Sequence, residues 1–210
     1  MTGFPKCGAV VKASRSVSTE QLRQTIMGLC AFPTRHTLSG ARGVDAAADW
    51  LVRRLQSFGG NLRVEKDTWL EPKGQRVDKP STISNVYAKI PGSKYPNHWV
   101  VISGHYDSRV TDVMDSTSNA PGANDDASGV AVTIEVARVL ANSKPEVGII
   151  FAALTGEEQG LLGAKHLADS LVAKGETVVA MATYDIVGNS MGADGKKRTD
   201  YIRIFSGGDT

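Results

Sequence analysis

The second half of the chain alternates between short apolar runs and helical patterns, and this order restricts the possible fold more than any other feature. The runs "HWVVISG", "VGIIFAAL" and "VVAMATY", which start at residues 98, 147 and 178, read as strands. Between them, apolar residues recur at helical spacing over residues 128–141 and 161–173. Strands that alternate with helices predict an α/β protein with a parallel sheet, and apolar runs without polar alternation predict central strands covered on both faces.

The first half of the chain predicts two helices and then further strands. Ser18 and Gln21 form a candidate capping box for the first helix, and the second covers residues 44–58 before a pair of glycines. The runs "NLRVEKDTWL" and "SNVYAKI" follow each other without a helix, so we expect an antiparallel part of the same sheet. A last strand is expected at "YIRIFSG", residues 201–207. We therefore predict a single domain over residues 1–210, a three-layer α/β sandwich with a mixed, mainly parallel central sheet.

Composition excludes several classes of partner. With 24 basic and 22 acidic residues the net charge is +2, which gives no electrostatic reason to expect nucleic acid or an acidic membrane surface. No apolar stretch approaches the roughly 20 residues of a transmembrane helix, and the N-terminus lacks an apolar run of signal-peptide length. Cys7 and Cys30 are too few for a zinc finger. They could form one disulfide or remain as two free thiols, and the sequence does not decide between these states.

Acidic and imidazole side chains follow three predicted strands at their carboxyl ends, and another acidic group precedes the helix at residue 128. Ligands of open α/β sheets bind outside these strand ends. Gathered carboxylates repel one another unless a cation neutralises them, and imidazole with carboxylate but without thiolate suits zinc, with manganese or cobalt as alternatives. The groups are His105 and Asp107, Glu157 and Glu158, Asp185, and Asn124-Asp125-Asp126.

Each group also has an ordinary structural interpretation when taken alone. His-x-Asp is compatible with a strand-end turn, Asp125-Asp126 with capping of the next helix, and Glu157-Glu158 with a solvated loop. Their occurrence together at successive strand–helix junctions is what favours a metal site. A central carboxylate could bridge two ions, as in two-metal hydrolases.

Four motifs in this order, "SGHYDS", "PGANDDASGVA", "LTGEEQGLLGA" and "YDIVGN", together with "TRHTLSG" near the N-terminus, resemble those of the zinc-dependent aminopeptidases of the M28 peptidase family. The resemblance implies a phosphorylase/hydrolase-like α/β sandwich of the zinc aminopeptidase type, a peptide substrate and two zinc ions. It also implies a secreted or periplasmic location, since most relatives are found there.

The resemblance also implies roles for individual residues. It implies metal-assisted hydrolysis of N-terminal peptide bonds, and a cis peptide bond between Asp125 and Asp126. The implied roles are: His105 and Asp185, ligands of the first zinc; Asp125, the carboxylate that bridges both ions; Glu158, a ligand of the second zinc; Glu157, the general base; and Asp107, the carboxylate that orients His105.

The sequence departs from the family pattern at the second zinc. The family takes a further histidine from a loop after "YDIVGN", whereas this sequence ends at Thr210, before such a loop. His166 falls inside a predicted helix and is interpreted as a helix residue, with His36 and His98 as loop and strand-entry residues. We expect a chain truncated before that histidine, one complete zinc site, a weak second site and little peptidase activity.

Three alternatives stay open. The chain could instead be complete with a shortened site, a non-catalytic interaction domain on the same scaffold, or a single-zinc acyltransferase that resembles glutaminyl cyclase. The sequence indicates neither the preferred substrate residue nor the oligomeric state, and it does not separate aminopeptidase from carboxypeptidase action.

Overall fold

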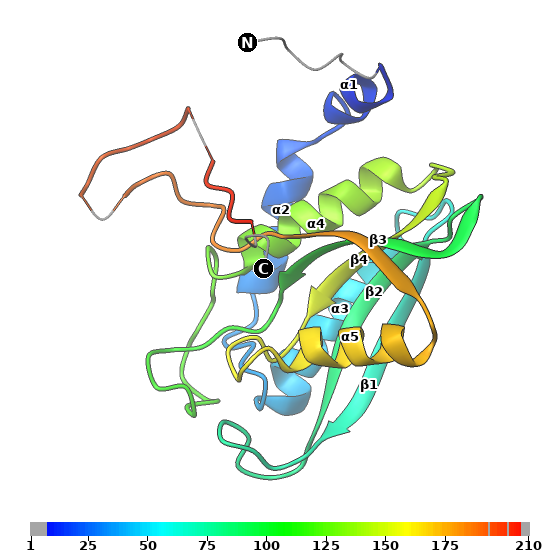
Figure 1. Ribbon diagram of the computed structural model, residues 1–210. Helices are drawn as coiled ribbons and strands as arrows, with labels where there is room; N and C mark the ends of the chain where they lie inside the picture. Colours follow the sequence, from blue (N-terminus) through cyan, green and yellow to red (C-terminus); the bar gives the residue numbers. More distant parts are fainter. Residues whose placement is uncertain (1–7, 193, 201, 207–210) are drawn as a thin grey trace.

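Five strands form one mixed sheet in the order β1-β2-β4-β3-β5 in the computed structural model, which describes residues 8–192, 194–200 and 202–206 (Figure 1). β1 pairs antiparallel with β2 and β2 with β4, whereas β3 runs parallel to both β4 and β5. The predicted mixed sheet with antiparallel early strands is therefore confirmed. The strands are β1 Arg63–Glu71, β2 Ser81–Ile90, β3 Tyr95–His105, β4 Val147–Leu154 and β5 Thr177–Thr183.

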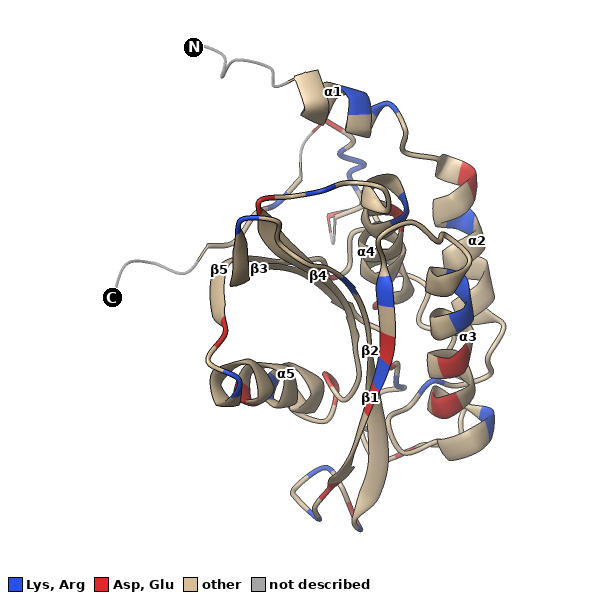
Figure 2. Ribbon diagram, turned by 90° about the vertical axis from the view of Figure 1, so that its right-hand side faces the viewer, with Lys and Arg blue, Asp and Glu red and all other residues tan. Residues whose placement is uncertain are grey.

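Helices cover both faces of this sheet, which gives the three predicted layers. α2, α3 and α4 lie on one face and α5 on the other (Figure 2). Each face has its own apolar core, one around Leu51, Ile134 and Phe151 and the other around Ile150 and Leu167. The helices are α1 Gly8–Ser14, α2 Thr19–Cys30, the short 3₁₀ helix η1 Gly40–Arg42, α3 Val44–Gln56, α4 Ala127–Leu140 and α5 Leu162–Ala173.

The predicted N-terminal cap of helix α2 is confirmed. The Ser18 hydroxyl accepts a hydrogen bond from the backbone N–H of Gln21 at 3.3 Å, as an N-cap serine does. The second predicted helix ends at Gln56 rather than at residue 58. None of the described helices combines the length and apolarity needed to cross a bilayer. Cys7 lies outside the described residues, and among the residues described Cys30 forms no disulfide.

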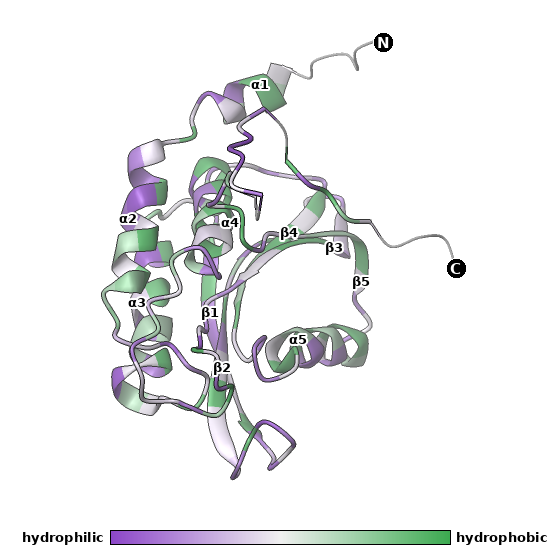
Figure 3. Cartoon of the chain, turned by 90° about the vertical axis from the view of Figure 1, so that its left-hand side faces the viewer, coloured by the Kyte–Doolittle hydropathy of each residue, from purple (hydrophilic) through white to green (hydrophobic). Residues whose placement is uncertain are grey.

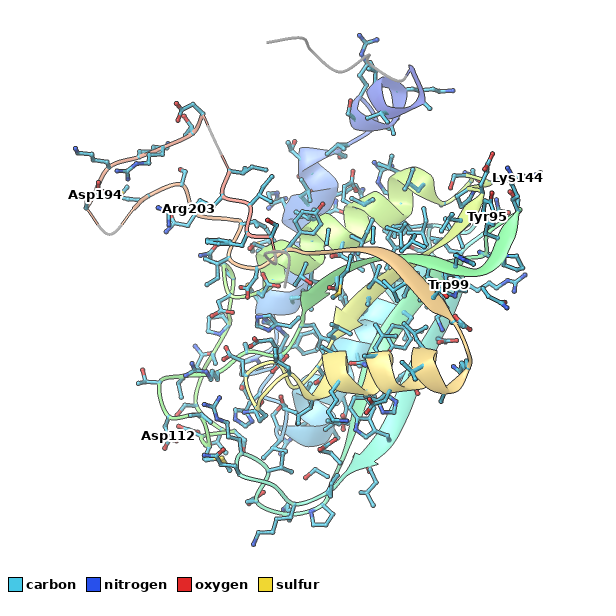
Figure 4. The ribbon with its side chains drawn as sticks, in the orientation of Figure 1. Tyr95, Trp99, Asp112, Lys144, Asp194 and Arg203 are labelled. Carbon is cyan, nitrogen blue, oxygen red and sulfur yellow. The ribbon has the colours of Figure 1, made fainter. Side chains whose placement is uncertain are left out.

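The strand predicted at residues 201–207 is wrong for its described part, residues 202–206, which have no regular structure. Ile202, Ile204 and Phe205 are more than four-fifths exposed, and no described strand pairs with this segment. A strand needs a hydrogen-bonded neighbour, so an apolar pattern alone cannot form one. Asp194 and Arg203 mark the extended segment after β5, which leaves the sheet (Figure 4).

Strand β5 is the exposed edge of the sheet. Val178, Val179 and Met181 are between 43 and 55% exposed, and the hydropathy colouring shows this apolar strand beside α5 (Figure 3). Its one described neighbour in the sheet is β3. The residues that follow β5 are held further by hydrogen bonds from the backbone N–H groups of Ile186 and Val187 to Asp126 and to the Ser128 hydroxyl.

Candidate metal centre

The parallel strands β3, β4 and β5 bring the predicted site residues to one edge of the sheet. His105 is the last residue of β3, and Asp185 lies two residues beyond the end of β5. Glu157 lies in the turn after β4. Because the carboxyl ends of parallel strands share one edge, side chains from distant parts of the chain converge there.

Three of these side chains come within metal-binding reach of one another. The Nε2 atom of His105 lies 3.1 Å from Asp125 Oδ1 and 3.9 Å from Asp185 Oδ1. One ligand atom from each residue lies within 4.8 Å of the other two. Tetrahedral zinc with bonds of about 2.0–2.1 Å places its ligands about 3.3 Å apart. The imidazole and carboxylate donors therefore fit a zinc ion both in chemistry and in spacing.

The two adjacent aspartates point in different directions. Their peptide bond is cis, which confirms that expectation. Asp126 is fully buried, and its carboxylate accepts from the backbone N–H groups of His105, Gly129 and Ile186 at 3.1, 2.9 and 3.2 Å. The side chain of Asp125 is half exposed and faces His105. The capping interpretation thus holds for Asp126, while Asp125 is free to bind a metal.

Asp107 connects β3 to the turn after β4. Its fully buried carboxylate accepts from the backbone N–H groups of Glu157 and Glu158 at 3.3 and 3.2 Å, and from the Thr37 hydroxyl at 3.0 Å. The Nδ1 atom of His105 hydrogen-bonds the Asp107 backbone carbonyl at 3.2 Å and lies 3.5 Å from its carboxylate. With Nδ1 engaged in this way, Nε2 is directed toward Asp125 and Asp185.

The carboxylates dominate the electrostatics of the centre. Burial alone lowers the pKa of His105, but hydrogen bonds and charges from Asp107, Asp125 and Asp126 outweigh it and raise this pKa to about 11. The hydrogen bond from His105 in turn lowers the pKa of Asp125. Burial, reinforced by neighbouring carboxylates, raises the pKa of Glu157. Glu157 therefore has a higher proton affinity than an ordinary glutamate, as a general base requires.

A cavity of about 240 Å³ adjoins the centre. Glu157, His105 and Asp185 line one part of it, and apolar side chains including Leu161 and Met181 line another. A larger hollow of about 440 Å³ has no carboxylate or imidazole in its lining, which includes Lys144. Lys144 and Tyr95 lie at the far end of the sheet from the segment that follows β5 (Figure 4). The candidate site residues therefore line the smaller cavity and not the larger one.

Glu158, the predicted ligand of a second ion, does not join the other three residues. Its carboxylate pairs with the guanidinium of Arg109, with 2.5 Å between Oε2 and Nε. Within the described chain, the group with metal-binding geometry comprises only His105, Asp125 and Asp185. A second cation at Glu158 would have to displace Arg109.

The other described histidines lie outside the centre, as expected. His166 lies in α5, where it stacks on Trp69 with ring centroids 3.9 Å apart, and its Nε2 lies 3.1 Å from Asp67. His98 lies in β3, and His36 is a buried loop residue.

Sequence reasoning assigned no role to Thr37 or Arg109, which contact Asp107 and Glu158. The only available signal was that Thr37 falls within "TRHTLSG" and that Arg109 follows "GHYDS" directly. Neither spacing indicates a contact across 70 or 49 positions of the chain.

Comparison with known proteins agrees with an α/β sandwich that has a candidate metal centre at the edge of its sheet. A model of peptidase family M28 matches residues 85–201. A probable zinc metalloprotease of Pyrenophora teres f. teres is 46% identical over 200 residues, and another from Pyricularia oryzae is 40% identical. Each alignment covers 91% of this chain, but only 41% and 40% of the two relatives. The chain belongs to peptidase family M28.

Solved structures share the fold. LapB from Legionella pneumophila has a TM-score of 0.71 at 25% identity, over 91% of this chain and 49% of that one. A glutaminyl cyclase from Porphyromonas gingivalis has a TM-score of 0.67 at 24% identity, over 82% and 60%. A leucine aminopeptidase precursor from Bacteroides thetaiotaomicron has a TM-score of 0.67 at 20% identity, over 84% and 65%. The predicted fold class is thus confirmed.

Proposed function

We propose that this chain carries the zinc centre of a metallopeptidase, and that the protein removes N-terminal residues from peptides. The observation that supports this most is the convergence of His105, Asp125 and Asp185 beside a cavity that Glu157 also lines. The relatives are probable zinc metalloproteases, and a structural neighbour is a leucine aminopeptidase precursor. We further propose that residues 1–210 belong to one peptidase domain.

A zinc ion held by His105, Asp125 and Asp185 would supply Lewis-acid activation of water and of the peptide carbonyl. Glu157 then accepts the proton of the attacking water and returns it to the leaving amine. Its raised pKa suits the first step, because a carboxylate with a higher proton affinity takes up the proton of the water more readily. Asp107 holds the His105 ring so that Nε2 faces the ion.

A second candidate is acyl transfer at one zinc, as in the glutaminyl cyclase neighbours. The pairing of Glu158 with Arg109 favours it, because within the described residues only one cation position has its ligands together. A third candidate, a non-catalytic interaction domain, predicts no turnover of either substrate.

The test uses the zinc-loaded protein with leucine p-nitroanilide and with a peptide that starts with glutamine. Aminopeptidase function predicts release of p-nitroaniline, and Glu157→Gln should lower kcat by about 10²–10⁴-fold while zinc stays bound. Glu146→Gln is the matched control, because Glu146 is a surface residue with a side chain 68% exposed. Cyclisation of the peptide without p-nitroaniline release would favour the acyltransferase. Unchanged turnover in Glu157→Gln would overturn the assigned base.

A further inference from the structure

Four consecutive polar residues, 34–37, are buried in the loop between α2 and η1. Their exposed fractions are 9% for Thr34, 0% for Arg35 and His36, and 2% for Thr37. They lie outside residues 85–201, the part that the family model matches. Buried polar groups are costly unless they are hydrogen-bonded, so their partners indicate what the segment does.

Arg35 ties this loop to two of the segments that carry predicted ligands, those of His105 and Asp125. Its guanidinium donates to the backbone carbonyls of Tyr106 at 2.6 Å and Gly122 at 3.1 Å, and its backbone N–H donates to the Ser108 hydroxyl at 3.1 Å. Tyr106 and Ser108 flank Asp107, and Gly122 starts the turn that leads to the cis peptide. The loop is therefore fixed relative to the metal centre.

Thr37 reaches the centre itself. Its hydroxyl donates to Asp107 Oδ2 at 3.0 Å, and the other donors to this oxygen and to Oδ1 are the backbone N–H groups of Glu157 and Glu158. Among the described residues, Thr37 thus gives the one side-chain hydroxyl bond to Asp107. Gln159 Oε1 is a second acceptor for this hydroxyl, so its single proton is shared between Asp107 and Gln159, and the Gln159 amide in turn donates to the Val113 carbonyl at 3.1 Å.

We propose that Thr37 is a positioning residue for the zinc ligand His105, acting through Asp107. Its hydroxyl fixes the plane of the Asp107 carboxylate, and that carboxylate together with the Asp107 carbonyl holds Nδ1 of the ring. The tautomer that leaves Nε2 free for zinc is thereby selected. The inference rests on the proposed function, because it takes His105 to be a zinc ligand.

The test compares zinc affinity by calorimetry in three variants. Thr37→Val keeps the shape but removes the hydroxyl, and we expect it to bind zinc about 10-fold more weakly, the lower end of the effect of losing a ligand's direct partner, because Thr37 acts through Asp107. Thr37→Ser keeps the hydroxyl and should stay within about 3-fold of the wild type. Thr133→Val is the matched control, because Thr133 is fully buried and its hydroxyl has no hydrogen-bond partner.

A spectroscopic readout separates positioning from loss of stability. In protein saturated with zinc and labelled with ¹⁵N-histidine, the Nδ1–H signal of His105 should shift in Thr37→Val and not in Thr133→Val. If Thr37→Val does not fold, Thr37→Cys takes its place, since a thiol of similar size is a weaker donor, and it should bind zinc more weakly than Thr37→Ser.

The possible failures differ from one another. A wild-type protein that does not bind zinc would overturn the proposed function and this inference with it. Zinc binding at wild-type affinity in Thr37→Val, with unaltered His105 signals, would overturn the inference alone.

Discussion

Gly129, the third residue of α4, lies where the helix start meets the segment after β5. A Cβ atom at this position would lie 2.1 Å from the backbone carbonyl oxygen of Tyr184 and 2.6 and 2.7 Å from the carboxylate oxygens of Asp126. Heavy atoms normally pack at about 3.5–4.0 Å, so Gly129→Ala requires the Tyr184 carbonyl to move by more than about 1 Å. That carbonyl belongs to the residue before Asp185, which must move with it.

The expected cost of Gly129→Ala has two parts. Alanine favours the helix by up to about 1 kcal/mol, whereas overpacking against a backbone atom costs about 1–3 kcal/mol, and the short contact places this substitution at the upper end. We expect a net loss of about 2 kcal/mol in the free energy of unfolding. Zinc ligands must lie within about 0.2 Å of their ideal distances, so displacement of Asp185 should weaken zinc binding by about 10–100-fold.

Urea denaturation of the metal-free protein and zinc calorimetry measure the two effects separately. Gly74→Ala is the control, because a Cβ there meets no heavy atom within 4 Å. Zinc affinity in Gly129→Ala equal to that of the wild type would refute the reasoning, since it would mean that Asp185 moves freely or does not bind the ion.

Three further predictions concern the charges of the centre and the core. In Arg109→Gln, the freed Glu158 should bind a second zinc at least about 10-fold more tightly, as loss of a charged hydrogen bond implies, and unchanged affinity in calorimetry would contradict this. Because the pKa of His105 is raised to about 11 without metal, zinc should release about one proton at pH 7 and bind about tenfold more tightly per unit of rising pH. Calorimetry in buffers of different ionisation enthalpy measures that proton, and its absence would contradict a His105 ligand with a raised pKa. Leu51→Ala, at a fully buried position of α3, should lower the free energy of unfolding by about 2–5 kcal/mol in urea denaturation, and a loss below about 1 kcal/mol would contradict the described packing.

Local patterns predicted the elements whose burial is set by their own sequence. The unbroken apolar run of β4 begins at Val147 and ends at Leu154, as predicted, because a strand covered on both faces needs apolar residues at every position. The Ser18 cap likewise depends on residues three apart. The strand prediction for residues 202–206 was wrong, because a strand forms only beside a neighbouring strand and a local pattern carries no information about that neighbour.

Some features of the candidate site were likewise predictable from the sequence, and others were not. The order of strands and helices was sufficient to predict that His105, Asp125 and Asp185 lie close together, because parallel strands end at one edge of a sheet. The orientation of adjacent side chains was not predictable, and so the pairing of Glu158 with Arg109 was missed. The contact of Thr37 with Asp107 joins residues 70 positions apart, and only the folded chain creates it.

The most direct test of a zinc centre at this sheet edge is a crystal structure of the zinc-loaded protein with anomalous data collected at the zinc edge. The account predicts an anomalous peak about 2.0–2.2 Å from His105 Nε2 and from oxygens of Asp125 and Asp185. A zinc peak at any other group of residues, with these three side chains unliganded, would contradict it.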